Sequence, residues 1–263
     1  MEIEKMTDSS YVFFKGLSRI DNDPIVGIIT GLNNPSRNIK TGEMYQVYVF
    51  VDNGLHPLDN VKSGADASIC GDCDRRPYLI ETGRSDLDFP CYLFKEMGRA
   101  VGAVWKSYNA GKIKAVSMSK VLSAIRYFER PLRLTTYGDP TAVPLDVWEP
   151  MIQAAAGHTG YSQFWNRPEN SDYKRFFQAS VFTAEQQAAA AALGWNTFRS
   201  DDTATDLDLA GSETRRRFMV KKEKLCPNPI SKINNPDRRP ITCAKCLLCA
   251  GTSKGRDLLV ASH

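Results

Sequence analysis

The sequence predicts an α/β protein: a (β/α) barrel-like or partial-barrel core, with an N-terminal antiparallel β segment and a C-terminal cysteine-rich metal loop. Strand-like and helix-like segments alternate after residue 130, Cys-x-x-Cys patterns stand outside that alternation, and basic residues gather at the C-terminus. The chain has 263 residues, 42% of them apolar, which is enough for one large domain or two small ones with a real core.

The N-terminal part is expected to be a small antiparallel sheet. Segments 11–14, 25–30 and 45–51 are rich in β-branched and aromatic residues, and Asn, Pro and Gly between the last two supply turn chemistry. Residues 53–91 are a polar stretch that we expect to be a loop. The sequence thus indicates a first segment, 1–91.

Helical spacing of apolar residues predicts helices at 92–110, 117–128 and 147–156. Strands are expected at 132–137, 159–165, 176–182, 195–198, 216–220 and 258–261. A further helix opens at Thr183-Ala-Glu-Gln186, which has capping-box spacing. Strand, helix, Gly194 and strand form a β-α-β unit, which implies parallel pairing and a right-handed crossover.

This alternation predicts a barrel-like core over 92–220, which a segment at 221–263 completes. An open doubly wound sheet is the competing arrangement. The pattern contains no P-loop, no Gly-x-Gly-x-x-Gly, no His-Glu-x-x-His and no Gly-x-Ser-x-Gly. ATP hydrolysis, Rossmann redox chemistry, zinc proteolysis and serine hydrolysis therefore lack their signatures.

Charge is distributed unevenly along the chain. Residues 215–263 contain 12 basic and three acidic side chains, a net charge of +9, although the whole chain carries only +4. A basic segment of this kind is typical of proteins that bind the phosphate groups of nucleic acids. We therefore expect a nucleic-acid partner for the C-terminal segment.

The second cysteine cluster, Cys226, Cys243, Cys246 and Cys249, is the strongest chemical signal in the sequence. Four thiolates complete a tetrahedral zinc site, and they also hold a 4Fe–4S cluster. Three evenly spaced cysteines favour the iron–sulfur cluster, whereas nearby arginines suit a nucleic-acid-binding zinc loop. The sequence leaves both metals open, along with thiols that bind none.

The first cysteine cluster, Cys70, Cys73 and Cys91, has three thiols and so is one ligand short of a closed zinc site. His56 lies 14 residues upstream and is a candidate fourth ligand. The alternatives are an incomplete iron–sulfur corner or a turn whose cysteines only pack. A thioredoxin-like role is disfavoured because this motif stands in an Asp-, Arg- and Pro-containing stretch.

Catalytic residues of a barrel stand at the C-terminal ends of its strands. Asp139 follows the predicted strand 132–137, and Asp201 follows the strand 195–198. His158, in a Gly-flanked turn, is the third candidate. Two such carboxylates would act as base and nucleophile across the mouth of a barrel. The alternative is that all three are turn or core residues.

The cysteine motifs also carry a resemblance. Over about residues 45–263 the chain resembles a cysteine-rich family of bacteriophage and mobile-element proteins, on Cys70-Gly-Asp-Cys73, Cys91-Tyr92, Val104-Trp105, Tyr137-Gly-Asp-Pro140, Cys226-Pro227 and Cys243-x-x-Cys246-x-x-Cys249. The resemblance implies a viral origin and brings no mechanism with it. A looser similarity links the barrel-like half and a four-ligand metal site to guanine transglycosylases, which use two aspartates and a zinc. Their zinc motif has a different spacing and a His ligand, and their aspartate motifs have no match here.

These observations predict a phage-encoded metal-containing enzyme that acts on nucleic acid or a nucleobase. The alternatives are an iron–sulfur redox protein and a non-enzymatic nucleic-acid-binding or host-interaction protein. The N-terminus has no apolar signal-like run, no stretch of about 18 apolar residues spans a membrane, and the clustered cysteines indicate reduced thiols. We therefore expect a protein of the cytoplasm, that of the host cell if it is viral, with no membrane partner.

Overall fold

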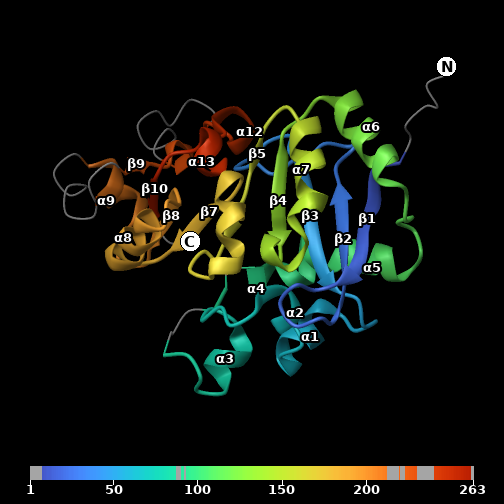
Figure 1. The fold of residues 1–263 in the computed structure, drawn as a ribbon, viewed down its shortest axis with the longest axis horizontal. Coiled ribbons are helices and arrows are strands. Elements are labelled where there is room, and N and C mark those ends of the chain that lie inside the picture. Colours follow the sequence, from blue (N-terminus) through green and yellow to red (C-terminus); the bar gives the residue numbers. More distant parts are fainter. Residues whose placement is uncertain are drawn as a thin grey trace. The chain divides into compact units, whose positions relative to one another are not determined.

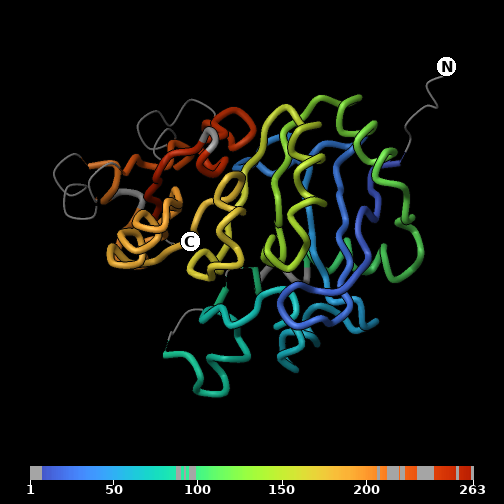
Figure 2. Tube along the Cα trace, in the orientation of Figure 1, coloured from blue at the N-terminus to red at the C-terminus, as the bar shows by residue number. Residues whose placement is uncertain are grey.

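The computed structural model describes residues 8–86, 90–91, 93–211, 219, 223–229 and 240–261. They form a mixed α/β protein, which confirms the predicted class (Figure 1). The chain divides into two compact units and passes between them more than once (Figure 2). The first unit is drawn from 1–34, 45–129 and 134–155, and the second from 35–44, 130–133 and 156–263. The segment expected over 92–220 is therefore shared between the two units.

The first unit is built on the predicted antiparallel sheet. Strands β1 (Ser10–Leu17), β2 (Pro24–Thr30) and β3 (Tyr45–Val51) pair in sequence order, and β4 (Leu132–Tyr137) lies beside β3. Every residue of β3 is buried, because this β-branched and aromatic strand lies inside the sheet. The sheet positions the segments that follow β3 and β4, which carry the first cysteine cluster and Asp139.

The region expected to be a polar loop contains three short helices, so that expectation is wrong. They are α1 (Pro57–Ser63), α2 (Ala67–Cys70) and α3 (Pro77–Glu81). Pro57 and Pro77 stand at the first position of α1 and α3, where proline suits a helix start. At four to seven residues, these helices are too short to show a 3.6-residue period.

The predicted helix over 92–110 is present but interrupted. It runs as α4 (Leu93–Glu96), a π-helical turn η1 (Met97–Val101) and α5 (Gly102–Asn109), with a non-helical backbone at Arg99. The predicted helix at 117–128 is confirmed as α6 (Met118–Phe128), and Ser117 caps its first turn. The 3₁₀ turn η2 (Pro140–Ala142) and α7 (Leu145–Ala154) complete the first unit.

The second unit contains a five-stranded sheet whose described pairs are all parallel. Its order is β6 (Tyr161–Ser162), β7 (Gln178–Val181), β8 (Thr197–Asp201), β10 (Leu258–Ala261) and β9 (Lys224–Leu225). The predicted β-α-β unit is confirmed, because α8 (Ala184–Ala192) joins β7 to the parallel β8 and the Thr183 side chain caps α8. The single strand expected at 159–165 is wrong. It is two short pieces, β5 (His158–Thr159) and β6, on either side of Gly160.

The remaining described elements of the second unit are short. They are η3 (Pro168–Arg175), α9 (Asp206–Ala210), α12 (Cys243–Cys246) and α13 (Gly251–Lys254). β5 pairs in parallel with Leu132 and Arg133, the two β4 residues that belong to this unit. The strand expected at 216–220 lies outside the described residues, apart from Met219.

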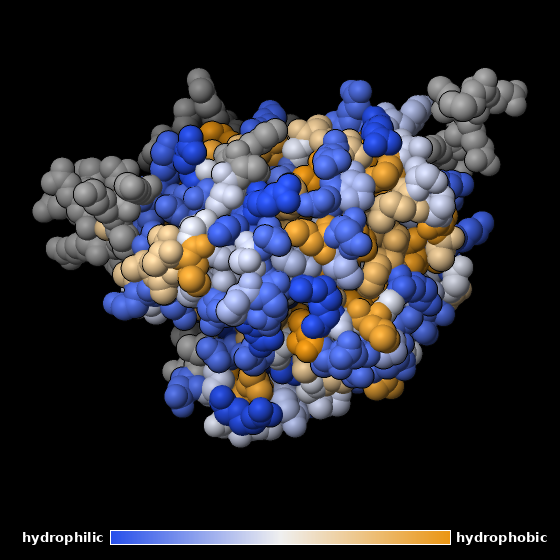
Figure 3. Space-filling model, viewed as in Figure 1, coloured by the Kyte–Doolittle hydropathy of each residue, from blue (hydrophilic) through white to orange (hydrophobic). Residues whose placement is uncertain are grey.

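Each unit has a buried apolar interior. In the first, Trp148 is fully buried, packs against Phe13 and donates its indole N–H to the Pro140 carbonyl. In the second, Leu259 and Ala261 of β10 pack with Leu209. Hydrophilic residues cover much of the face drawn in Figure 3. Within the described part of the chain, no helix has the length and apolar character needed to cross a bilayer.

Two candidate metal centres

The first cysteine cluster is built on the turn that follows α2. Cys70 is the last residue of α2, and the Cys73 N–H donates to the Cys70 carbonyl at 3.1 Å. The Arg76 N–H then donates to the Cys73 carbonyl at 3.0 Å. Gly71, between the cysteines, has φ +51°, which favours glycine. The turn therefore holds Cys70 and Cys73 close to each other.

Cys91 joins this turn through the backbone. Its N–H donates to the Arg75 carbonyl at 2.8 Å, so a residue distant in sequence is held beside Cys73. Two of the three sulfurs also accept backbone N–H groups, Cys73 from Arg75 and Cys91 from Leu93. Such donors stabilise negative charge on sulfur.

The three thiols lie close enough to influence one another. Burial raises the pKa of Cys70 well above its usual range, and negative charge on Cys73 and Cys91 raises it further. Burial raises the pKa of Cys73 to about 12, and Cys91 adds to that shift. The thiols are therefore protonated at neutral pH unless a cation compensates their charge.

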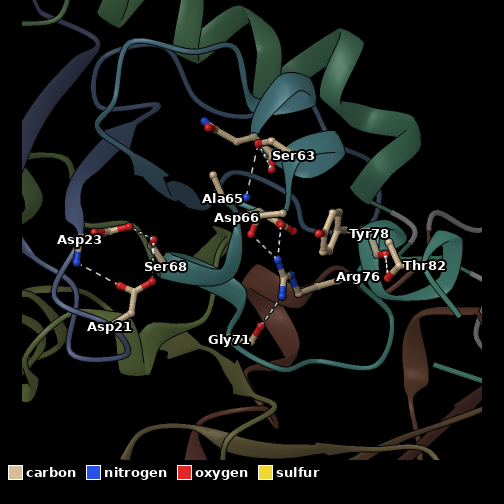
Figure 4. A network of polar contacts seen from close by, with 12 residues as sticks. Asp21, Asp23, Ser63, Ala65, Asp66, Ser68, Gly71, Arg76, Tyr78 and Thr82 are labelled. Atoms are coloured by element: carbon tan, nitrogen blue, oxygen red, sulfur yellow. Dashed lines mark hydrogen bonds and ion pairs between the residues drawn. The ribbon is translucent and has the colours of Figure 1, made fainter. Parts of the chain in front are cut away.

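A buried ion pair supports this turn (Figure 4). Arg76 donates to the Asp66 carboxylate at 2.6 Å, to the Gly71 carbonyl at 2.6 Å and to the Gly64 carbonyl at 2.7 Å. Ser68 of α2 donates to the Asp21 carboxylate at 2.8 Å. These bonds fix α2 and the cysteine turn against each other and against the hairpin of β1 and β2.

The predicted catalytic motif Tyr137-Gly-Asp-Pro140 lies against the same helix. The Asp139 N–H donates to the Ile69 carbonyl at 2.7 Å. The Asp139 carboxylate, which is buried, accepts from the N–H and hydroxyl of Thr141 and raises the pKa of Cys70 and Cys73. Burial raises the pKa of Tyr137, and the charge of Cys70 adds to that rise. The structure thus places the Tyr137–Pro140 motif, which was predicted to be catalytic, against the first cysteine cluster, which was predicted to bind metal.

The second cysteine cluster lies in the second unit. Cys243 and Cys246 begin and end α12, and the Cys243 N–H donates to the Lys40 carbonyl at 3.0 Å. The Cys249 carbonyl accepts the Gly160 N–H at 3.0 Å, which places Cys249 beside the residue that separates β5 from β6. The Cys226 N–H donates to the Leu259 carbonyl of β10 at 2.8 Å. Cys226 and Cys249, the first and last cysteines of the cluster, are therefore both held by backbone hydrogen bonds to the strand region of the second unit.

Asn228 links the two parts of this cluster. Its side-chain amide donates to the Ile241 carbonyl at 2.8 Å, so the residues after Cys226 lie beside those before Cys243. The Tyr161 hydroxyl donates to the thiol of Cys249. Burial raises the pKa of Cys249 well above its usual range, Tyr161 opposes this, and negative charge on Cys226, Cys243 and Cys246 adds to it. The other three thiols of the cluster are thus within electrostatic reach of Cys249.

Cationic side chains lie near this cluster. Arg133 and Lys40 both lower the pKa of Cys243, which burial raises. A cation beside a thiol favours the thiolate, the form that binds metal. Among the residues that the structure describes, however, no three His, Cys, Asp or Glu side chains already stand in an arrangement that holds a metal ion.

The three predicted catalytic residues are divided between the units. Asp139 lies in the first unit, and His158 and Asp201 lie in the second, so their common cleft stays a prediction. The His158 ring is buried and pairs with the Phe176 carbonyl at 3.0 Å. His56, the candidate fourth ligand, accepts the Leu58 N–H and packs against Trp105. Each of these side chains has a structural partner.

Sequence reasoning missed two buried ion pairs. One is Asp66 with Arg76, and the other joins Arg199 of β8 to Glu223 through two hydrogen bonds of 2.8 Å. Arg199 also binds Asp201 at 2.8 Å, so this candidate catalytic carboxylate is part of a charged group of three. The pairs join residues 10 and 24 positions apart. The signals in the sequence were weak: Arg76 directly before Pro77, and Arg199 directly after the predicted strand 195–198.

Comparisons of this chain with protein-family models, with curated proteins and with solved structures found no match. The functional argument therefore rests on the two cysteine clusters and the charges around them.

Proposed function

We propose that this protein is a metal-containing enzyme acting on a nucleic acid or a nucleobase, and that the second cysteine cluster holds its structural metal. The observation that carries the proposal is the gathering of Cys226, Cys243 and Cys246 near Cys249, which the hydrogen bonds of Cys226 with Leu259, of Gly160 with Cys249 and of Asn228 with Ile241 bring about. Four thiolates from four positions satisfy one zinc ion or one 4Fe–4S cluster. Metal bound there would fasten 223–229 and 240–249 to the parallel sheet, and so couple folding of this segment to loading.

Charge supports the nucleic-acid part of the proposal. The segment 215–263 carries +9, and Lys40 and Arg133 lie beside Cys243 in the same unit. Phosphate contacts from such groups give sequence-independent affinity that falls steeply with salt. The bacteriophage-like motifs are compatible with a nucleic acid as target.

The barrel-like arrangement is also part of this proposal. β5 and β6 are separated by Gly160 alone, and the Gln178 N–H of β7 donates to the Gly160 carbonyl at 3.0 Å. This segment pairs in parallel with Leu132 and Arg133 through β5 and with β7 through β6, and such a run of parallel pairs is what a partial barrel needs. The candidate catalytic residues of this proposal are Asp139, which follows β4, Asp201, the last residue of β8, and His158, the first residue of β5.

The experiment is nucleoside analysis. Protein purified without oxygen is incubated with DNA or RNA, the nucleic acid is digested, and nucleosides are identified by mass spectrometry. The proposal predicts an altered nucleoside that disappears with Asp139→Asn, a variant that should retain the metal. Asp202→Asn is the matched control and should remain active. Folded, metal-loaded protein that alters no nucleoside contradicts the enzymatic proposal.

An iron–sulfur redox protein is the second candidate, favoured by the spacing Cys243-x-x-Cys246-x-x-Cys249. It predicts a brown protein whose visible absorption bleaches on reduction. Colourless protein with stoichiometric zinc removes this candidate and leaves the structural zinc of the first one.

A further inference from the structure

We propose that a cavity formed by the end of β3 and by α5 binds a single neutral, flat heterocycle that carries an amino group, the chemistry of a nucleobase such as adenine or cytosine. Every residue that lines this cavity belongs to the first unit. The proposal rests on the cavity alone, and it stands or falls separately from the function proposed above, because binding requires no reaction.

The size of the cavity limits what it can hold. Its volume is about 240 Å³, which is below the ~300–1,000 Å³ of sites that take drug-sized molecules. Gly54 and Gly111 form part of its lining, and a Cβ added at either would meet no atom of the surrounding described residues within 4 Å. The backbone is therefore open to a ligand at these two positions. A single ring system suits such a space, whereas a large cofactor does not.

Two aromatic rings give the cavity a stacking surface. Trp105 and Tyr108 are three residues apart on α5, so their side chains lie on the same side of this helix. Both are half-buried and line the cavity. His56 packs against Trp105 with the ring centroids 5.0 Å apart and the planes at 74°, which limits the positions that the indole can take. Aromatic side chains of this kind stack on nucleobases, because every base has a π face.

A fixed carboxylate stands beside these rings. The Tyr108 hydroxyl donates to Oδ1 of Asp52 at 2.7 Å, and the Lys15 ammonium forms an ion pair with Oδ2 at 3.2 Å. A carboxylate has about four lone-pair positions, so about two remain for a ligand. The Asp52 side chain is 25% exposed and lines the cavity, so a ligand can reach it. The amino group of a heterocycle is a donor that suits such an acceptor.

Charge favours a neutral ligand over a cation or an anion. Among the described residues that line the cavity, Asp52 alone is charged, and Lys15 already offsets that charge. The Lys15 ammonium also lies 5.4 Å from the centroid of the Tyr108 ring, so a second cation near this ring would be repelled. An anion would face the Asp52 carboxylate. The ion pair is neutral as a whole, and a neutral donor fits it best.

Asn109 completes the polar lining of the cavity. It is exposed, and its side-chain amide can both donate and accept a hydrogen bond. Adenine and cytosine carry an amino donor next to a ring nitrogen that accepts. Such a ring therefore has a complementary group for Asp52 and another for Asn109.

Calorimetric titration of the full-length chain with adenine tests the proposal. Purine, the same ring without the amino group, is the matched ligand and should bind at least about tenfold more weakly, because it offers no donor to the carboxylate. Benzylammonium, a cationic ring, should not bind. A short oligo(dA) in a second arm distinguishes a free base from a base within single-stranded DNA.

Variants connect the binding to this cavity. Asp52→Asn should weaken adenine binding by about tenfold or more, since it replaces a charged acceptor. Trp105→Leu should weaken it by roughly fivefold or more, since it removes a stacking ring. Asp59→Asn, at an exposed position of α1 outside the lining, and Trp165→Leu, in the second unit, are the matched controls and should bind as the wild type does.

The proposal is overturned if neither adenine nor oligo(dA) binds, if purine binds as tightly as adenine, if benzylammonium binds in place of adenine, or if Asp52→Asn and Trp105→Leu both bind as the wild type does. Photolabelling of the wild-type chain with 8-azidoadenine, read by peptide mass spectrometry, covers the case of misfolded variants. Adducts should lie on peptides that contain Asp52, Trp105 or Tyr108, and adducts confined to other peptides overturn the proposal. Failure of the function proposed above is distinct, because it appears as adenine binding without any altered nucleoside.

Discussion

Arg76 donates to Asp66 across 2.6 Å, and both side chains are almost completely shielded from water. The same guanidinium binds the carbonyls of Gly64 and Gly71, so one side chain closes the turn that carries Cys70 and Cys73. Burial raises the pKa of Asp66 and Arg76 opposes that rise, because removing a carboxylate from water is costly even beside a cation. The pair therefore holds the shape of the first cysteine cluster at an energetic cost.

Asp66→Asn should destabilise the protein by about 3–5 kcal/mol, because it leaves the Arg76 charge buried without its anion. Replacing both partners, with Asp66→Leu and Arg76→Met, should cost much less than the sum of the single changes. Chemical denaturation of Asp66→Asn tests the first value. Denaturation of the wild type, Asp66→Leu, Arg76→Met and the double variant measures the coupling between the two side chains. Additive single effects would show that the pair contributes nothing as a pair.

Gly138→Ala should destabilise by roughly 1–3 kcal/mol. Gly138 has φ +84°, and a Cβ there would lie 3.0 Å from the Cβ and 3.1 Å from the carbonyl oxygen of Val49. Gly83→Ala is the control, since Gly83 also has positive φ, at +67°, but faces open space. Thermal unfolding compares the two variants. An equal loss in both would mean that crowding against β3 is unimportant.

Glu223→Gln should cost about 3–5 kcal/mol, because Arg199 loses the charge of its bidentate, fully buried partner. Asp201→Asn should cost clearly less, because the Asp201 side chain is 14% exposed and makes a single bond to Arg199. Denaturation curves separate these effects. If Asp201→Asn abolishes activity with little loss of stability, Asp201 has a catalytic role as well as a structural one.

Tyr161→Phe should weaken metal binding at the second cysteine cluster by about 10–100-fold without unfolding the chain, since it removes the hydroxyl that donates to Cys249. Tyr127→Phe, at an exposed position, is the matched control. Competition with a chelator measures the affinity of both. Identical affinities would exclude Tyr161 as a supporting partner of the metal ligands.

Strong local patterns made part of the fold predictable. The segment 45–51 is β-branched and aromatic throughout, and it became the buried strand β3. Thr183 and Gln186 stood at capping-box spacing, and the Thr183 hydroxyl accepts the Gln186 N–H. In both cases the residues that predicted the element all lie within that element or at its first turn.

The parts of the fold and of the candidate site that the sequence did not predict depend on contacts between residues far apart in the chain. Helices α1, α2 and α3 are too short to show periodicity, so the stretch 53–91 was predicted to be a loop. The Asp66–Arg76 pair and the packing of Asp139 on Ile69 arise only when the chain has folded. Cysteine spacing indicated both clusters, but only the structure ties Cys91 to the turn of Cys70 and Cys73 and places Cys226 within electrostatic reach of Cys249.

X-ray absorption at the metal edge tests the central claim most directly, that the second cysteine cluster binds one metal centre. The measurement uses the Cys73→Ser and Cys91→Ser double variant, so that only the second cluster contributes. The account predicts a bound metal whose nearest neighbours are sulfur atoms alone, at about 2.3 Å. A metal surrounded by nitrogen and oxygen, or a folded chain that binds none, would contradict it.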